Sequence, residues 1–312
     1  MDGTRGQQEA LARLILEAMP RDGSRLLRKG VQVNRLSSVN QPLASLPKPA
    51  FCVIAQGAKV VHLGTERFRY DPEHYLIASV DLPVSSQVVE ASPDRPYLSL
   101  RMELDAALVT SVLLETGTPE VRAGEPVRAM DVSELDAALR DAVIRLVHLA
   151  LAQPDGNDPY LVALVEREIV YRLLTGNQGA RLCYMMAGQA AAQGIVAAID
   201  RLRREFDQPL RMEALAQDLG MSVSALHHRF KEVTAMSPLQ FQKQVRLQEA
   251  RRLMVQEGFD ATTAGLQVGY GSMSQFSREY KRQFGEPPMR DIERLRLDST
   301  ASSTAPWAMP AD

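Results

Sequence analysis

The chain has 312 residues, which is long for one domain and favours two. With 45% apolar and 24% charged residues it has the composition of an ordinary soluble globular protein, and its formal net charge of −2 decides nothing about nucleic acid. Two cysteines, Cys52 and Cys183, are too few for a disulfide framework, and no apolar run approaches the roughly 18 residues of a membrane span. We therefore expect a cytoplasmic protein with reduced thiols and no membrane partner.

The first 24 residues are expected to carry one helix, because apolar residues follow helical spacing between Gln7 and Met19. From Arg25 to Glu103 the pattern changes to short β-branched and apolar stretches separated by turn signals. The pairs Gln56-Gly57 and Leu63-Gly64 are interpreted as hairpin turns. The segment is therefore predicted to form a small sandwich or barrel with strands near 31–33, 51–55, 59–63, 75–80, 87–90 and 97–102.

Helical periodicity then extends from Leu104 to Gly194. Ser133 is interpreted as the N-cap of one helix, and Pro159, which follows Asp158, as the first residue of another. The strands and these helices are expected to form one domain over residues 25–194, in which an apolar helical stripe is used either for packing or for a homodimer interface. The three predicted helices cover 105–116, 133–153 and 159–175.

The remainder is expected to be a second, all-helical domain over residues 195–298, followed by a disordered tail, 299–312, rich in serine, threonine, alanine and proline. The helical domain holds 16 lysine and arginine residues against 14 acidic ones. This excess of positive charge is small, so any argument for DNA depends on the pattern of residues.

A helix-turn-helix is predicted between Leu210 and Val233. Gly220 ends the first helix and Ser222 caps the second, whose inner face carries Leu226, Phe230 and Val233. The opposite face is polar and lacks acidic residues up to Glu232, as insertion into a major groove requires. That face carries Ser224, His227, His228 and Lys231.

The same pattern recurs fifty residues later, which indicates two copies of one unit. Between the copies, Ser237-Pro238 begins a helix that continues to about Glu257 and is ended by Gly258. Its roughly 30 Å length is close to one turn of B-DNA, so it could hold two recognition helices in successive major grooves. The repeated positions are Ser222, Leu226, Phe230 and Lys231, which become Ser272, Phe276, Tyr280 and Lys281.

This region, about a hundred residues long, resembles the AraC/XylS family of transcription regulators. The resemblance is carried by Leu215-Ala216, Gly220-Met221-Ser222, Arg229-Phe230-Lys231, Ser237-Pro238, Ala250-Arg251, Val268-Gly269-Tyr270, Ser274-Gln275-Phe276-Ser277-Arg278 and Phe284-Gly285. It implies promoter binding, most often with activation, and RNA polymerase as a partner. Two departures are Ala235, where the family usually has glycine, and Gly265, where alanine is usual and glycine costs about 1 kcal/mol of helix propensity.

Residues 49–103 also resemble the sensor domain of one AraC subgroup, through stretches such as Cys52-Val53-Ile54-Ala55-Gln56-Gly57 and Tyr70-Asp71-Pro72. That domain is cupin-like, binds an effector and supports dimerisation. The resemblance thus implies an α+β chain: an N-terminal cupin-like β-barrel with a helical dimerisation segment, and a C-terminal all-α domain of two helix-turn-helix units.

The candidate DNA contacts follow from position on the two recognition helices. Arg278 suits a bidentate contact to guanine, and Met273 a contact to a thymine methyl. In each case the alternative is an ordinary surface or packing residue. The candidate base contacts are Ser224, His227, His228, Met273, Ser274, Ser277 and Arg278, and the candidate phosphate contacts are Lys231, Lys243 and Lys281.

The candidate effector contacts in the sensor domain are Cys52, Tyr70, His74 and Arg101. Cys52 is either a reactive thiol or a buried inert one, and the inert reading is favoured. No metal or cofactor is expected, because His62 and His74 are solitary and the clustered ligands of a cupin metal site are missing.

Three other readings compete with an effector-responsive regulator. A cupin-type enzyme with a helical appendage would need a catalytic or metal constellation, which the sequence lacks. A DNA-repair fusion would need a cysteine in a Pro-Cys-His context, whereas Cys52 and Cys183 lie in Phe-Cys-Val and Leu-Cys-Tyr. An interaction protein that uses the helices of 133–175 is compatible with the regulator and would describe its dimer interface.

Overall fold

The computed structural model of the chain describes residues 2–117, 128–152, 159–186 and 190–301. The N-terminal half is mostly strands: α1 (Asp2–Ala18), β1 (Gly23–Arg28), β2 (Val31–Leu36), β3 (Leu43–Ser45), β4 (Ala50–Gln56), β5 (Ala58–Leu63), β6 (Glu66–Tyr70), β7 (His74–Ala78), β8 (Val84–Glu90), β9 (Tyr97–Glu103), α2 (Ala106–Thr116) and β10 (Met130–Glu134). The rest is helical: α3 (Ala137–Ala152), α4 (Pro159–Thr175), α5 (Gly179–Met186), α6 (Ala190–Arg204), α7 (Met212–Asp218), α8 (Val223–Thr234), α9 (Pro238–Gln256), α10 (Ala261–Gln267), α11 (Met273–Phe284) and α12 (Pro288–Ala301).

The strands form two antiparallel sheets, in the orders β1-β2-β9-β4-β7-β10 and β3-β8-β5-β6. The predicted hairpin at Leu63-Gly64 is confirmed, since Leu63 pairs with Glu66 and Gly64 has a φ of +59°. The predicted hairpin at Gln56-Gly57 is wrong. There the chain crosses from one sheet to the other, because β4 pairs with β7 and β9 whereas β5 pairs with β6 and β8.

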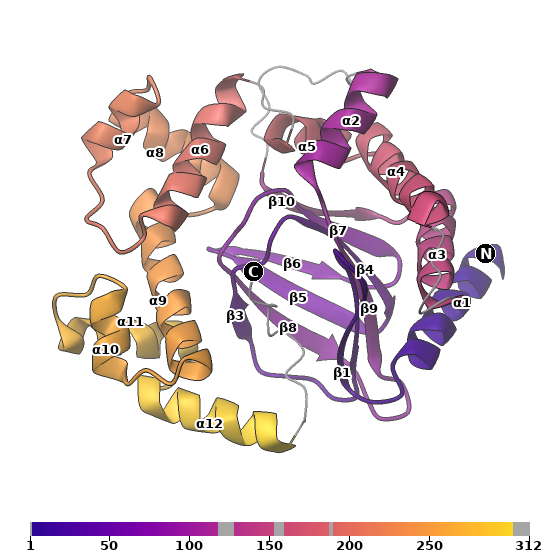
Figure 1. The fold of residues 1–312 in the computed structure, drawn as a ribbon, viewed down its shortest axis with the longest axis horizontal. Coiled ribbons are helices and arrows are strands. Elements are labelled where there is room, and N and C mark those ends of the chain that lie inside the picture. Colours follow the sequence, from indigo (N-terminus) through magenta and orange to yellow (C-terminus); the bar gives the residue numbers. More distant parts are fainter. Residues whose placement is uncertain (1, 118–127, 153–158, 187–189, 302–312) are drawn as a thin grey trace.

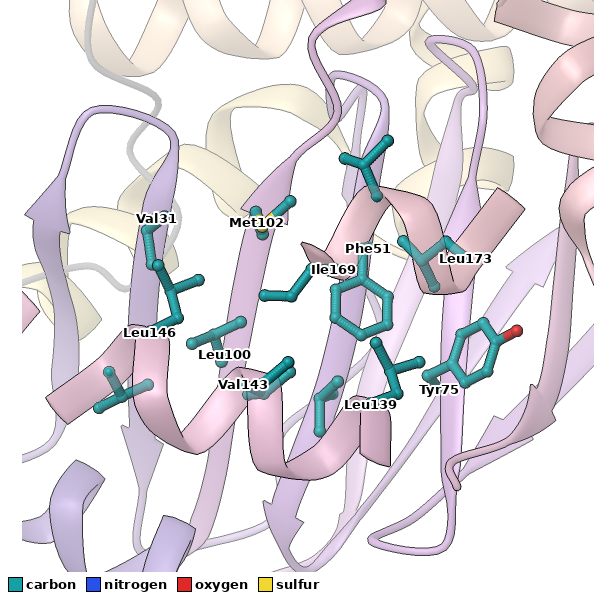
Figure 2. Close-up of a cluster of buried hydrophobic side chains, with 14 of the residues drawn as sticks. Val31, Phe51, Tyr75, Leu100, Met102, Leu139, Val143, Leu146, Ile169 and Leu173 are labelled. Carbon is teal, nitrogen blue, oxygen red and sulfur yellow. The ribbon is translucent and has the colours of Figure 1, made fainter. Parts of the chain in front are cut away.

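The six-stranded sheet is covered on its outer face by α1, α3 and α4 (Figure 1). Along each strand, alternate side chains point to opposite faces of the sheet. Leu98, Leu100 and Met102 of β9 therefore join the helix-covered core, whereas Ser99 and Arg101 point between the two sheets. Figure 2 shows the outer core, in which Val31, Phe51, Tyr75, Leu100 and Met102 from the sheet meet Leu139, Val143, Leu146, Ile169 and Leu173 from α3 and α4.

One sequence expectation fails in the segment between the sheet and the helices. Ser133 does not cap a helix: it lies in β10, paired with Tyr75 of β7. Asp136 takes the capping role, because its carboxylate accepts a 2.8 Å hydrogen bond from the main-chain nitrogen of Leu139 at the start of α3. Ser133 lies in a strand because its pairing with β7 outweighs the local sequence signal for a helix N-cap.

The expected segment boundaries fall close to the ends of observed elements. The boundary between residues 194 and 195 lies inside α6, which begins at Ala190. α12 ends at Ala301, so residues 299–301 of the expected disordered tail are helical, and the rest of that tail lies outside the described residues. Asp158 also lies outside them, although α4 begins at Pro159 as expected.

The C-terminal helices pack beside the barrel on the side away from α1 and α3 (Figure 1). One apolar cluster runs from the barrel, through Ile54 and Tyr70, into the first pair of C-terminal helices at Leu226 and Phe230. The second pair of helices has its own core around Phe276 and Tyr280. Within the described ranges, no helix has the length and apolar composition that crossing a membrane requires.

Candidate DNA-binding surface and effector cavity

The first helix-turn-helix consists of α7 and α8. Gly220 makes the turn with a φ of +63°, a value that favours glycine. The main-chain nitrogen of Met221 donates to the Ala216 carbonyl oxygen at 2.9 Å. Ser222 then caps α8, its hydroxyl accepting from the main-chain nitrogen of Ala225 at 3.2 Å. The predicted inner face of α8 is confirmed, because Leu226, Phe230 and Val233 are all buried.

The outer face of α8 is exposed and rich in hydrogen-bond donors. His228 is the most prominent residue, with 75% of its side chain exposed and its Nδ1 atom 3.3 Å from the Glu232 carboxylate. This contact lies near the last turn of α8. The other candidate contacts, Ser224, His227 and Lys231, are also exposed.

The second helix-turn-helix repeats this arrangement with α10 and α11. Gly269 makes the turn with a φ of +83°, and Ser272 caps α11 by accepting from the main-chain nitrogen of Gln275 at 3.4 Å. Phe276 and Tyr280 are buried on the inner face. The outer face exposes Ser274, Ser277, Arg278 and Lys281.

Met273 differs from the other candidate contacts because it is half-buried and packs against the second core. A Cβ placed on Gly265 would lie 3.0 Å from the Met273 sulfur and 3.2 Å from the Phe276 ring. The methionine therefore occupies the room that an alanine would take in α10. Glycine at position 265, where the family usually has alanine, therefore makes room for the partly buried side chain of Met273.

α9 connects the two units and spans 19 residues, about 28 Å at 1.5 Å per residue. A capping box fixes its start. The Ser237 hydroxyl accepts a hydrogen bond from the main-chain nitrogen of Gln240, and the Gln240 side chain accepts one from the main-chain nitrogen of Ser237. The first unit and the second unit lie near opposite ends of α9 (Figure 1).

Lys243, a candidate phosphate contact, makes an internal ion pair. Its Nζ lies 2.9 Å from the carboxylate of Glu279, a buried residue of α11 that also accepts hydrogen bonds from Tyr270 (2.9 Å) and Gln275 (3.3 Å). Burial raises the pKa of Glu279, but these donors outweigh it and hold the pKa below its ordinary value. Lys243 thus ties α9 to the second unit.

The two units are held together by different chemistry at equivalent positions. In the first, Phe230 packs edge-on against Phe241, with ring centroids 5.5 Å apart. Fifty residues on, these positions are Tyr280 and Asp291, and the tyrosine hydroxyl donates to the aspartate at 2.9 Å. Asp291 is fully buried and also receives two hydrogen bonds from Arg251, at 2.8 and 2.9 Å.

The exit turn of the first unit has the same form as that of the second, despite the alanine. Ala235 adopts φ +58° and ψ 14°, and its main-chain nitrogen donates to the carbonyl oxygen of Lys231. Gly285, at the equivalent position, has a φ of +85° and donates to Lys281 in the same way. The departure from glycine at position 235 therefore leaves the turn in place, because the alanine adopts a left-handed conformation.

The second feature of interest is a cavity of about 190 Å³ between the two sheets of the barrel. Three of the four candidate effector contacts, Cys52, Tyr70 and Arg101, line it. His74 does not, because it lies at the start of β7, where its Nδ1 is 2.7 Å from the Asp71 carboxylate. Apolar side chains make up much of the rest of the wall, among them Leu43, Val61, Leu76, Val84 and Met130.

Sequence reasoning missed further polar residues of this cavity, among them Lys59 and Tyr97. The signal was available, because Lys59 is in phase with Val61 on β5 and Tyr97 is in phase with Ser99 and Arg101 on β9. It also missed the buried acids Glu279 and Asp291, for which a single sequence offers no cue.

An enzyme would need a constellation of metal ligands or catalytic groups. Among the described residues, no three histidine, cysteine or acidic side chains meet in a group that could hold a metal ion. Burial raises the pKa of the Cys52 thiol, although Arg101 and Lys59 act to lower it, so the reactive thiolate is disfavoured. Burial likewise raises the pKa of Cys183, to about 11.

Curated relatives match parts of the chain. The HTH-type transcriptional regulator ArgR of Pseudomonas aeruginosa is 26% identical over 186 residues, which are 60% of this chain and 56% of that protein. The HTH-type transcriptional activator RhaS of Salmonella schwarzengrund is 30% identical over 95 residues, 30% of this chain and 34% of that protein. The matches therefore span between a third and just over half of these relatives' lengths.

A solved structure shares the fold over most of the chain. ToxT from Vibrio cholerae superposes with a TM-score of 0.56, covering 88% of this chain and 99% of ToxT at 10% sequence identity. Two protein families also match, AraC-type transcriptional regulator N-terminus over residues 28–181 and helix-turn-helix domain over residues 215–294. The first match covers most of the barrel and its cavity, and the second covers most of both helix-turn-helix units. The chain therefore belongs to the AraC-type transcriptional regulators.

Proposed function

We propose that the chain is a sequence-specific DNA-binding transcription regulator that responds to a small-molecule effector. One observation carries the proposal: two copies of a helix-turn-helix, each with an exposed polar recognition face, lie near the two ends of a capped helix about 28 Å long. This length is close to the roughly 34 Å repeat of B-DNA, so two faces can address successive major grooves from one side of the duplex.

The exposed residues divide by the chemistry they can perform. We assign base reading to Arg278, whose guanidinium fits the two acceptors of guanine, and to Ser277 beside it. On α8 we assign it to His227 and His228, which offer ring nitrogens, and to Ser224. Ser274 supplements the second helix, and the half-buried Met273 presents only part of its side chain. Lys231 and Lys281 are assigned to phosphates, whereas Lys243 is engaged with Glu279.

The cavity is assigned to the effector, because it is enclosed by the barrel and lies on elements that reach α8. Met130 lines the cavity, and the preceding residue, Ala129, donates its main-chain hydrogen to the Val233 carbonyl oxygen at 3.0 Å. Val61 lines it from β5, whose turn at Gly64 contacts Ala235. A change in the cavity can therefore reach the last turn of the first recognition helix.

The remaining assignments concern partners and place. Activation through RNA polymerase is proposed, since curated relatives are named activators. Homodimerisation is assigned to the helices that follow the barrel, where Leu164 and Tyr171 of α4 and Leu114 of α2 are exposed. A bacterial-type regulator works where the chromosome lies, so we place the protein in the cytoplasm.

The test is genome-wide selection of fragmented DNA from the source organism by the purified protein. An Arg278→Ala/His228→Ala double variant removes one donor set from each recognition helix. Arg67→Ala is the control, because Arg67 is an exposed arginine of the barrel and its loss changes the formal charge equally. Melting curves verify that all three proteins fold.

The proposal predicts a few strongly selected sites for the wild-type and Arg67→Ala proteins, and loss of that selection in the double variant. Measurements at about 100 mM salt weaken contacts made to phosphates alone, so the retained sites reflect base reading. Equal selection by the double variant would show that these faces do not read DNA. A uniform, sequence-independent DNA-selection profile for the wild-type protein, both with and without extracts of small metabolites, would refute the proposed function.

A further inference from the structure

The effector cavity has a size and a lining that restrict what it can hold. It encloses about 190 Å³ between the sheets, comparable to the engineered apolar cavity of roughly 150 Å³ that accepts benzene. The occupant's body is therefore compact and apolar. Apolar wall residues come from both sheets, and they include Leu26, Leu43, Leu76, Val84 and Met130.

The charges of the lining do not balance. Arg101 is neutralised locally, because its Nη1 lies 3.2 Å from the Glu103 carboxylate and its Nη2 donates to the Lys48 carbonyl oxygen at 2.8 Å. Glu103 is the acidic side chain of this lining. Two lysines also belong to the lining: Lys48, which is exposed, and Lys59, which is partly buried and has neither an ion pair nor a hydrogen bond to any described residue. The lining therefore carries more positive than negative charge.

The position of Lys59 makes this imbalance costly. It lies on β5 beside Val61, faces the thiol of Cys52 and the guanidinium of Arg101, and pairs across the strands with Tyr70. Burial lowers the pKa of Lys59, while Cys52 acts to raise it and Arg101 acts to lower it. A methionine at this position would fill similar space without a charge, so a lysine here favours an anionic occupant of the cavity.

We propose that the cavity binds a small monocarboxylate with a compact apolar body, and that the carboxylate pairs with the ammonium of Lys59. This inference rests on the proposed function, because it names the effector class of the same cavity. Lys59 is the less exposed of the two lysines of the lining, and its one ammonium matches a monoanion. A phosphate dianion would leave a negative charge buried among apolar side chains.

The test compares acids with their neutral amides of equal shape. The probes are hexanoate with hexanamide and 3-phenylpropanoate with 3-phenylpropanamide, and phenyl phosphate serves as the dianion. Binding to the full chain is measured by calorimetry and by the shift in melting temperature. The variants are Lys59→Met, Lys59→Arg and, as the matched control, Lys29→Met, which alters an exposed lysine outside the cavity lining.

For the wild-type protein and Lys29→Met, we expect at least one acid to bind at least roughly tenfold more tightly than its amide. In Lys59→Met the ratio should fall to about one, and in Lys59→Arg the preference for the acid should return, which separates lost charge from lost fold. Phenyl phosphate should bind more weakly than the acids.

Three outcomes would overturn the inference: amides that bind the wild-type protein as well as the acids, an acid preference that survives Lys59→Met, or no binding of any acid at millimolar concentration. DNA selection is measured on the same preparations. Normal DNA selection with no acid preference would refute the ligand class alone, whereas acid binding without DNA selection would refute the regulator and leave the chemistry of the cavity standing.

Discussion

Gly64 rests against the main chain of Ala235: a Cβ placed on Gly64 would lie 2.5 Å from the Ala235 carbonyl oxygen. Gly64 is the turn of the β5–β6 hairpin, and Ala235 is the residue that ends α8. The hairpin thus carries the wall of the cavity at one end and touches the first recognition helix at the other. Only a residue without a side chain permits this approach.

Gly64→Ala should separate the hairpin from α8. The new methyl group collides with Ala235, and the φ of +59° at residue 64 adds about 1–2 kcal/mol of strain. We expect faster hydrogen exchange at the main-chain amides of residues 233–236, measured by mass spectrometry. Gly30→Ala is the control, because Gly30 has a φ of +81° but a Cβ there would meet nothing closer than 3.7 Å. If both variants exchanged alike at α8, strain rather than contact would be the cause.

Ala235 and Gly285 allow the two exit turns to be exchanged. Ala235→Gly relieves the left-handed alanine and should stabilise the protein by up to about 1 kcal/mol, because the glycine's extra freedom in the unfolded chain offsets part of the gain. Gly285→Ala introduces the same conformation for alanine in the second unit and should destabilise it by about 1–2 kcal/mol. Urea unfolding measures both. Effects of the same sign in the two variants would contradict the left-handed strain as their origin.

Much of this architecture could be predicted from the sequence, because its signals are local. Ser222 and Ser272 cap recognition helices where expected, and the fifty-residue repeat locates both units. The repeat did not predict one difference between the units. Phe241 makes an aromatic contact, whereas Asp291 at the equivalent position accepts a hydrogen bond. The buried Asp291 is stabilised by Arg251 and Tyr280, which lie on other helices. Such tertiary contacts cannot be predicted from local sequence signals.

The cavity, too, has features that local sequence patterns predict and features that depend on the tertiary fold. The alternation of Leu98, Leu100 and Met102 with Ser99 and Arg101 could be assigned to two faces of a strand from the sequence. Which face meets helices and which encloses a cavity depends on the pairing of β5 with β8 in a second sheet. The hairpin expected at Gln56-Gly57 would have joined both strands in one sheet, and Lys59 would not then have faced Cys52.

Asp291 should be the most sensitive residue of the second unit. Asp291→Asn removes the charge that neutralises Arg251, and leaving a buried cation unpaired costs roughly 3–5 kcal/mol. Thermal unfolding of the variant checks this. Arg294→Ala is the control, since Arg294 is a partly exposed partner of the same aspartate and its loss should cost about 0–1 kcal/mol.

An Arg251→Met/Asp291→Leu variant tests the interpretation of this site, because it removes both charges at once and fills the space with apolar atoms. It should be more stable than Asp291→Asn. A double variant at least as unstable as the single one would mean that packing of the aspartate, and not its charge, holds α12 in place.

Lys281 and Lys243 should separate DNA contact from internal pairing. Lys281 is exposed on α11, so Lys281→Ala should reduce the slope of log affinity against log salt by about 0.9 for one lost phosphate contact, with melting unchanged. Lys243 pairs with the buried Glu279, so Lys243→Ala should lower the melting temperature. Its salt slope should stay near that of the wild-type protein. Filter-binding titrations at several salt concentrations, with melting curves on the same samples, distinguish the two. A reduced slope for Lys243→Ala without loss of stability would show that this lysine leaves Glu279 and reaches the phosphates when DNA binds.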